Sequence, residues 1–139
     1  MSSSRSTIST PHLSNDKKKR EKARHLARQL IDSDTAVLAV LIFDREGKAF
    51  AYESQPHARG SEKPGAKEID RIALVELVAL KMGERPGQDT GKTDYVMYVY
   101  EKVKIFVTEL RDADFILGMK LTRSSNAEYI LNKVLKDFR

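Results

Sequence analysis

The chain has 139 residues, a formal net charge of +5 and no cysteine. Its length predicts a single domain that can bury a core without covalent staples. The lack of cysteine excludes disulfides and thiolate metal sites within these residues and is typical of a cytoplasmic protein. The longest apolar stretch, residues 36–43, is too short to span a bilayer, so no membrane span is expected.

Positive charge is concentrated near the N-terminus. Residues 1–31 contain eight Lys or Arg and two Asp or Glu, whereas the remainder is almost neutral. Residues 1–15 are rich in Ser and Thr and poor in large apolar side chains, which predicts a disordered arm. Residues 16–139 are expected to form one domain that begins with a basic helix at residues 17–31. This helix either docks through its apolar face with its cations solvated or contacts an anion or nucleic acid. The candidate contacts are Lys17, Lys18, Lys19, Arg20 and Arg24.

Two strands joined by a tight turn follow the basic helix. Residues 34–43 are apolar on both alternating faces, which predicts a central strand that is covered from both sides. The turn at residues 44–47 ends in Gly47, which can adopt positive φ, and residues 48–54 return as the hairpin partner. Residues 55–65 contain several Gly and Pro and are predicted to be a flexible linker.

The helix predicted at residues 66–82 has two apolar faces. The first is a broad stripe formed by Ile69, Ile72, Ala73, Leu77, Ala79 and Leu80. The second lies on nearly the opposite side and consists of Leu74, Val75, Val78 and Met82. A helix with two apolar faces covers two surfaces, and a single sheet offers only one of them. We therefore expect the second surface to belong to another protein chain, the alternative being a loop of this chain.

Glu76 falls within the first apolar stripe, where an unpaired carboxylate is costly. We expect it to lie at a rim or to pair with a basic group, the alternative being a buried acid that makes a specificity contact in an interface. A catalytic role would require a second acid or a base nearby, and the sequence nominates none. The three histidines have no acid, cysteine or serine at a diagnostic spacing. No catalytic residue, metal ligand or cofactor is therefore predicted.

The C-terminal part is predicted to contain three strands and a helix. The strands at residues 95–100, 103–110 and 115–122 are joined by short turns and form a meander. The tyrosines of the first strand could stack on bases, although tyrosine is also common in strands for its β preference alone. Ser125 and Glu128 have the spacing of a capping box at the start of the final helix.

The order helix, two strands, helix, three strands, helix resembles that of the Roadblock / dynein light chain family, in its prokaryotic and in particular its archaeal type. The similarity extends from about Ala23 to Phe138. It rests on three segments, which are AVLAVLIFDREGKAFAYES, EIDRIALVELVALKM and FILGMKLTRSSNAEYILNKVLKDF. These segments are hydrophobic patterns rather than chemical signatures, and longin and profilin-like folds share much of the same order.

The resemblance implies an α+β fold with a five-stranded antiparallel sheet flanked by helices, in the order α-β-β-α-β-β-β-α. The first and last helices would cover one face and the middle helix the other. It also implies a homodimer, or a heterodimer of paralogues, that pairs through the middle helix and the adjacent edge strand. On this sequence the implied dimer interface consists of Leu74, Val75, Val78, Met82, Tyr95, Met97, Tyr98 and Tyr100.

Members of that family are typically non-catalytic scaffolds or regulators of small Ras-like GTPases in signalling or trafficking complexes. The resemblance therefore implies a protein that is not an enzyme and that has a small GTPase as partner. Two other functions stay open. A nucleic-acid-associated module would bind through the basic N-terminal arm and helix. A small-ligand sensor would need a cavity beneath the sheet, and the dense apolar pattern argues against one.

Overall fold

The computed structural model describes residues 2–56, 63–84, 89–110 and 114–136. The elements within these residues are α1 (Ser2–Ser33), β1 (Val37–Asp44), β2 (Ala49–Ser54), α2 (Ala66–Met82), β3 (Tyr95–Val99), β4 (Val103–Glu109), β5 (Phe115–Thr122) and α3 (Ala127–Leu135). The predicted α+β class, the five-stranded antiparallel sheet and the order of elements are confirmed. The middle of the predicted linker at residues 55–65 lies outside the described residues.

The strands pair in the order β2-β1-β5-β4-β3, each antiparallel to its neighbours. β1 and β5 therefore lie inside the sheet, and the neighbouring β1 residues Ile42 and Phe43, which face opposite sides of the sheet, are both completely buried. This agrees with the central strand predicted at residues 34–43. β3 is an edge, and its outer side has no strand partner among the described residues. Such an edge is a template for association with another chain.

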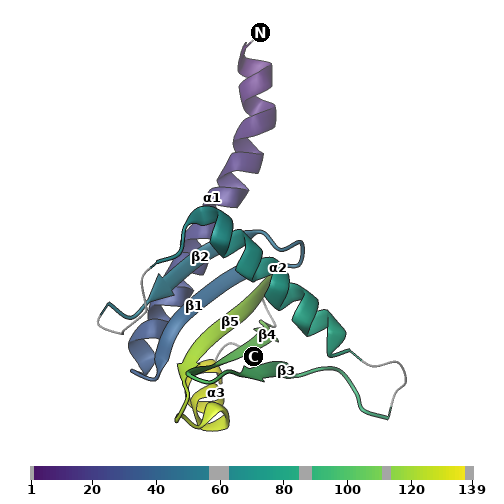
Figure 1. The fold of residues 1–139 in the computed structure, drawn as a ribbon. Helices are drawn as coiled ribbons and strands as arrows, with labels where there is room; N and C mark the ends of the chain where they lie inside the picture. Colours follow the sequence, from purple (N-terminus) through teal and green to yellow (C-terminus); the bar gives the residue numbers. More distant parts are fainter. Residues whose placement is uncertain (1, 57–62, 85–88, 111–113, 137–139) are drawn as a thin grey trace.

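The helices divide between the two faces of the sheet (Figure 1). α1 and α3 pack on one face, where Leu30 and Ile130 join a core that includes Phe106 of β4. α2 lies diagonally across the other face and contributes Ile69, Ala73, Leu77 and Leu80 to a second core. The layers are those that the resemblance implies. Within the described part of the chain, no layer covers the outer side of α2.

α1 is longer than the helix predicted at residues 17–31, because it begins at Ser2. Its C-terminal half is docked on the sheet through buried side chains, which are Ala23, Leu26, Ala27, Leu30 and Ile31. Its N-terminal half projects away from the sheet (Figure 1). A projecting helix lacks the tertiary packing that stabilises most helices in proteins, and the disorder expected for residues 1–15 stays a prediction.

The turn and cap predictions had different outcomes. Gly47 adopts φ +85°, so the positive φ predicted for the turn between β1 and β2 is confirmed. The predicted capping box is wrong by one residue. Asn126 caps α3, because its side chain accepts from the backbone N–H of Tyr129, whereas the Ser125 hydroxyl donates to a carbonyl of the preceding turn. Asn and Ser are equally good N-caps, so the local sequence did not distinguish them.

Candidate interaction surface

Four apolar side chains of α2 face away from the sheet. Leu74 is 50% exposed, Val75 59%, Val78 53% and Met82 79%. We call these four residues the α2 stripe. Single exposed apolar residues are normal on proteins, but a contiguous row on one helix face is typical of an interaction site. The second apolar face expected from the sequence is therefore open to solvent in the single chain.

The β3 residues of the expected interface divide between the two faces of the sheet, because side chains alternate along a strand. Tyr95 and Met97 pack against the core beneath α1 and α3. The Tyr95 ring meets Phe106 nearly edge-on, with 6.2 Å between the ring centroids. Tyr98 and Tyr100 lie on the α2 side, with ring centroids 6.4 Å apart. Only this second pair shares a surface with the α2 stripe.

α2 leaves part of its sheet face uncovered, because the helix crosses the strands at an angle (Figure 1). Residues paired across neighbouring strands point to the same face. One row, which packs beneath α2, consists of Val96, Val107, Gly118 and Leu41. The next row consists of Tyr98, Ile105, Lys120 and Ala39. This second row forms the floor of a trough beside α2.

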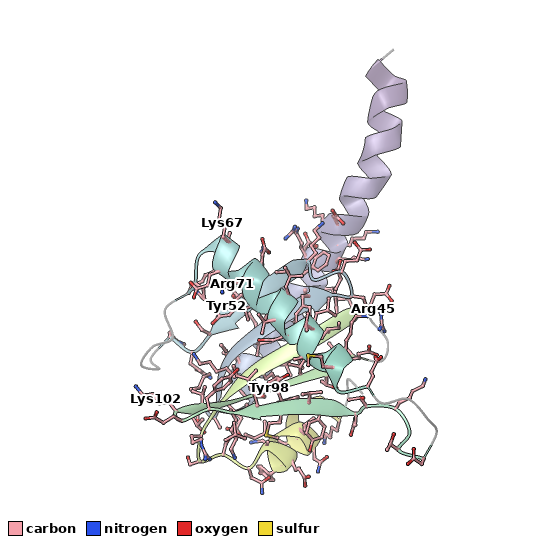
Figure 2. The ribbon with its side chains drawn as sticks, turned by 45° about the vertical axis from the view of Figure 1, so that its right-hand side comes forward. Arg45, Tyr52, Lys67, Arg71, Tyr98 and Lys102 are labelled. Carbon is pink, nitrogen blue, oxygen red and sulfur yellow. The ribbon has the colours of Figure 1, made fainter. Side chains whose placement is uncertain are left out.

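Two adjoining grooves make up the trough. The groove nearer β3 has a volume of about 520 Å³ and the groove nearer β2 about 440 Å³. Residues that line both grooves are Glu68, Ile72, Glu76 and Ile105. Figure 2 shows Tyr52 and Arg71 near the N-terminal half of α2 and Tyr98 on the strand below the helix. The first groove also contacts Val75, Val78 and Met82, so the trough is continuous with the α2 stripe.

Glu76 extends from α2 onto β5 at Gly118. It is only 8% exposed, and its Oε1 has no hydrogen-bond partner among the described residues. A Cβ placed on Gly118 would collide with the Glu76 carboxylate, so the glycine provides the space that this side chain occupies. The expected rim position is therefore wrong, and no basic partner of Oε1 is found among the described side chains.

Burial changes the acidity of Glu76. Desolvation raises the pKa of its carboxyl to about 8, so this group is mostly protonated at neutral pH. The pKa of the neighbouring Tyr52 hydroxyl is also raised, first by burial and then by the negative charges of Glu76 and Glu68. Lys63 and Lys120 line the same groove, and burial is the cause of the raised Glu76 pKa.

The five basic residues singled out on α1, Lys17, Lys18, Lys19, Arg20 and Arg24, are all exposed. The Arg20 guanidinium lies 5.4 Å from the centroid of the Phe50 ring, against β2. Two ion pairs join α1 to the β1–β2 hairpin, Arg28 to Glu53 at 2.9 Å and Lys48 to Asp16 at 3.3 Å. Such exposed pairs contribute little stability, so the apolar face of α1 determines its docking.

Sequence reasoning identified Glu76 but not the residues around it. Gly118 and Lys120 come from β5 and Tyr52 comes from β2, and only the sheet register brings the two strands to one side of α2. A glycine in the middle of an apolar strand signals a close approach. Gly118 gives this signal, but a glycine alone does not indicate which residue approaches it.

Among the described residues, no group of three or more His, Asp or Glu is arranged to hold a metal ion. No helix of the described part of the chain is both long and apolar enough to cross a membrane. Within the described residues, the candidate surface therefore consists of the apolar α2 stripe and one buried acid, Glu76, beside it.

Solved structures with a similar fold come from a defined class of proteins. A Roadblock/LC7 domain from Streptomyces avermitilis is 14% identical, with a TM-score of 0.62 over 81% of this chain and 90% of that one. The gliding protein MglB from Thermus thermophilus is 16% identical, with a TM-score of 0.55 over 79% and 78%. MglC from Myxococcus xanthus is 15% identical, with a TM-score of 0.54 over 81% and 92%.

Comparisons with protein-family models and with curated proteins gave no match. The structural likeness nevertheless defines the fold of this chain as that of Roadblock/LC7 domains. This agrees with the resemblance found in the sequence, and at these identities it concerns the fold alone.

Proposed function

We propose that this protein is a non-catalytic member of the Roadblock family that acts as a dimeric scaffold or regulator. The observation that carries the proposal is the exposed α2 stripe beside the unpaired edge of β3. Pairing of two copies through α2 and β3 would bury the α2 stripe and would also give hydrogen-bond partners to the backbone groups on the outer side of β3. A structure with the same fold is described as MglB in a tetrameric arrangement, which supports assembly as a use of this fold.

The partner that we propose is a small Ras-like GTPase or a complex that contains one. This part of the proposal comes from the family resemblance. The protein would provide a binding surface and would catalyse no reaction. It would act in the cytoplasm, and a second copy or a paralogue would complete the binding surface. An archaeal origin is likewise an expectation from the resemblance.

Cysteine crosslinking tests the proposed interface, because the natural chain has no cysteine. Val78→Cys places a single thiol on the α2 stripe without adding charge. We expect a short bismaleimide to convert this variant to a covalent dimer at low protein concentration. Tyr129→Cys is the matched control, because Tyr129 is an equally exposed residue on α3, far from the stripe. Equal crosslinking of both variants would contradict an interface at α2.

A second candidate, nucleic-acid binding, is favoured by the exposed cations at the start of the docked part of α1. It predicts that log affinity falls by about 0.9 per phosphate contacted for each tenfold rise in salt.

The triple change Lys17→Gln, Lys18→Gln, Lys19→Gln separates the two candidates. Nucleic-acid binding, measured by fluorescence anisotropy on duplex DNA and on single-stranded RNA, should be lost. Binding to Ras-like GTPases of the same genome, loaded with a GTP analogue, should persist. Loss of GTPase binding in this variant would mean that the contact involves α1 and not the α2 surface.

A further inference from the structure

The groove nearer β2 has a cation on its floor that nothing in the described chain neutralises. Lys120 is half-buried on β5 and lies on the α2 side of the sheet, between Ile105 and Ala39 of the neighbouring strands. Its ammonium group has neither an ion pair nor a hydrogen bond within the described residues. Partial burial removes water from a charged group, and a partner of opposite charge offsets that cost. Lys120 therefore favours an anion in this groove.

The other charged groups of the groove also favour an anion. Lys63 lines the groove together with Lys120, and Glu68 opposes them with one carboxylate. Burial raises the pKa of the Glu76 carboxyl to about 8, so this group is mostly neutral at neutral pH. Two ammonium groups and one carboxylate leave the described lining with one positive charge, which matches a ligand with one negative charge. Arg71 adds a further cation in the adjoining groove.

The rest of the lining indicates an anion with an apolar body. Leu41, Ile72 and Ile105 provide alkyl surface, and Tyr52 adds a hydroxyl group. The pKa of Tyr52 is raised, first by burial, so its hydroxyl stays protonated and can donate a hydrogen bond. The volume of about 440 Å³ lies within the range of roughly 300–1,000 Å³ that is typical of small-molecule sites.

We propose that the groove nearer β2 binds a small organic carboxylate, a free molecule with an alkyl or aryl body and a single negative charge. Its carboxylate accepts hydrogen bonds from Lys120, and its apolar body packs against Ile72 and Ile105. The described lining of this groove includes no residue of the α2 stripe and none of β3. Pairing of two copies through α2 and β3 therefore does not involve the groove, and the site is independent of the proposed dimer.

Ionisation of Glu76 gives the site a pH dependence. The titratable or charged groups that line the two grooves around Glu76 are Tyr52 from β2, Lys120 from β5, Glu68 and Arg71 from α2, and Lys63 before α2. A bound carboxylate and an ionised Glu76 repel each other, so binding should weaken as the pH rises through the Glu76 pKa of about 8. Glu76→Gln stays neutral and should not show this weakening.

The test uses hexanoate, with hexanol as the uncharged control and acetate as the control without an apolar body. Each is titrated into the ¹⁵N-labelled natural protein, and the amide shifts of Gly118 and Ile105 are followed. We expect saturable shifts with hexanoate and much weaker binding of both controls. Lys120→Met keeps an apolar side chain and removes the charge, so it should lower the affinity for hexanoate by about tenfold or more, as expected for one charge-assisted hydrogen bond.

Lys67→Met is the matched control variant. Lys67 is exposed at the start of α2 and extends away from the sheet (Figure 2), so its replacement should change the affinity for hexanoate little. Equal losses in Lys67→Met and Lys120→Met would mean that only the general positive charge of the protein attracts hexanoate, which contradicts a site. Absence of saturable shifts, equal binding of hexanol, or an affinity that Lys120→Met leaves unchanged would also overturn the proposal.

A further arm separates this proposal from the proposed dimer. Val78→Glu is designed to prevent pairing through the α2 stripe, and it should bind hexanoate as well as the natural protein does. Binding to Val78→Glu alone would mean that a second copy covers the groove, and the proposed site would be overturned. If the solution mass shows that the natural protein is a monomer, the dimer proposal fails, whereas the hexanoate titration still decides the site.

Discussion

Replacing Glu76 with Gln is expected to stabilise the protein at alkaline pH and to have little effect at acidic pH. The buried carboxyl has a pKa of about 8 in place of its ordinary 4.5. A raised carboxyl pKa means that the folded state binds the proton more tightly than the unfolded state does. The natural protein should therefore lose stability as the pH rises between these two values, by about 5 kcal/mol at most. The neutral amide of Gln does not titrate, so it escapes this loss.

The measurement is urea unfolding of the natural protein and of Glu76→Gln at several pH values from about 5 to about 9, a range set by the two pKa values. The free energies of unfolding should be similar at the acidic end and should diverge as the pH rises. Asp34→Asn is a useful contrast, because two hydrogen bonds, from the Ala36 amide and Lys133, lower the pKa of Asp34. Asp34→Asn should lower the free energy of unfolding by a similar amount throughout this pH range, because the stabilisation from ionised Asp34 is lost only as the pH falls towards its lowered pKa. Parallel curves for the natural protein and Glu76→Gln would show that Glu76 is not buried as described.

Adding a methyl group at Gly118 is the second change with a large expected effect. The new Cβ would enter the space of the Glu76 carboxylate. Overpacking a well-filled site typically costs about 1–3 kcal/mol, and here it also displaces a carboxyl from its position under α2. We expect Gly118→Ala to lower the free energy of unfolding by an amount in this range.

A double-mutant cycle shows whether the cost arises from Glu76. In the Glu76→Ala background the collision is absent, and alanine is better tolerated than glycine in a strand. Gly118→Ala should then be neutral or slightly stabilising, which corresponds to a coupling energy of about 1 kcal/mol or more. Additive effects of the two substitutions would mean that Gly118 is required for another reason.

The sequence predicted the elements with strong hydrophobic patterns and predicted others poorly. The bounds of α2 and β5 agree with the predictions, because the periodic apolar positions of the helix and the alternation of the strand end abruptly at Gly or polar residues. The start of α1 at Ser2 differs from the predicted start at residue 17, because residues 2–16 carry no apolar periodicity from which a helix could be recognised.

The candidate surface could be predicted only in part. The α2 stripe follows from helical spacing alone, which is a local property of residues 74–82. The trough does not, because it depends on the angle at which α2 crosses the sheet and on the pairing of Ile105 with Lys120 and of Lys120 with Ala39. Contacts between residues distant in sequence, such as Glu76 over Gly118, are specified by tertiary packing and not by a local pattern.

The central claim is that two copies pair through the α2 stripe, and solution mass measured by light scattering tests it most directly. We expect twice the 15.8 kDa of one chain for the intact protein. We expect a folded monomer for Val78→Glu, because an interface that buries an unpaired carboxylate from each copy is strongly disfavoured. Tyr129→Glu, which adds the same charge on α3, should stay dimeric. A monomeric intact protein, or a Val78→Glu variant that remains dimeric, would contradict the account.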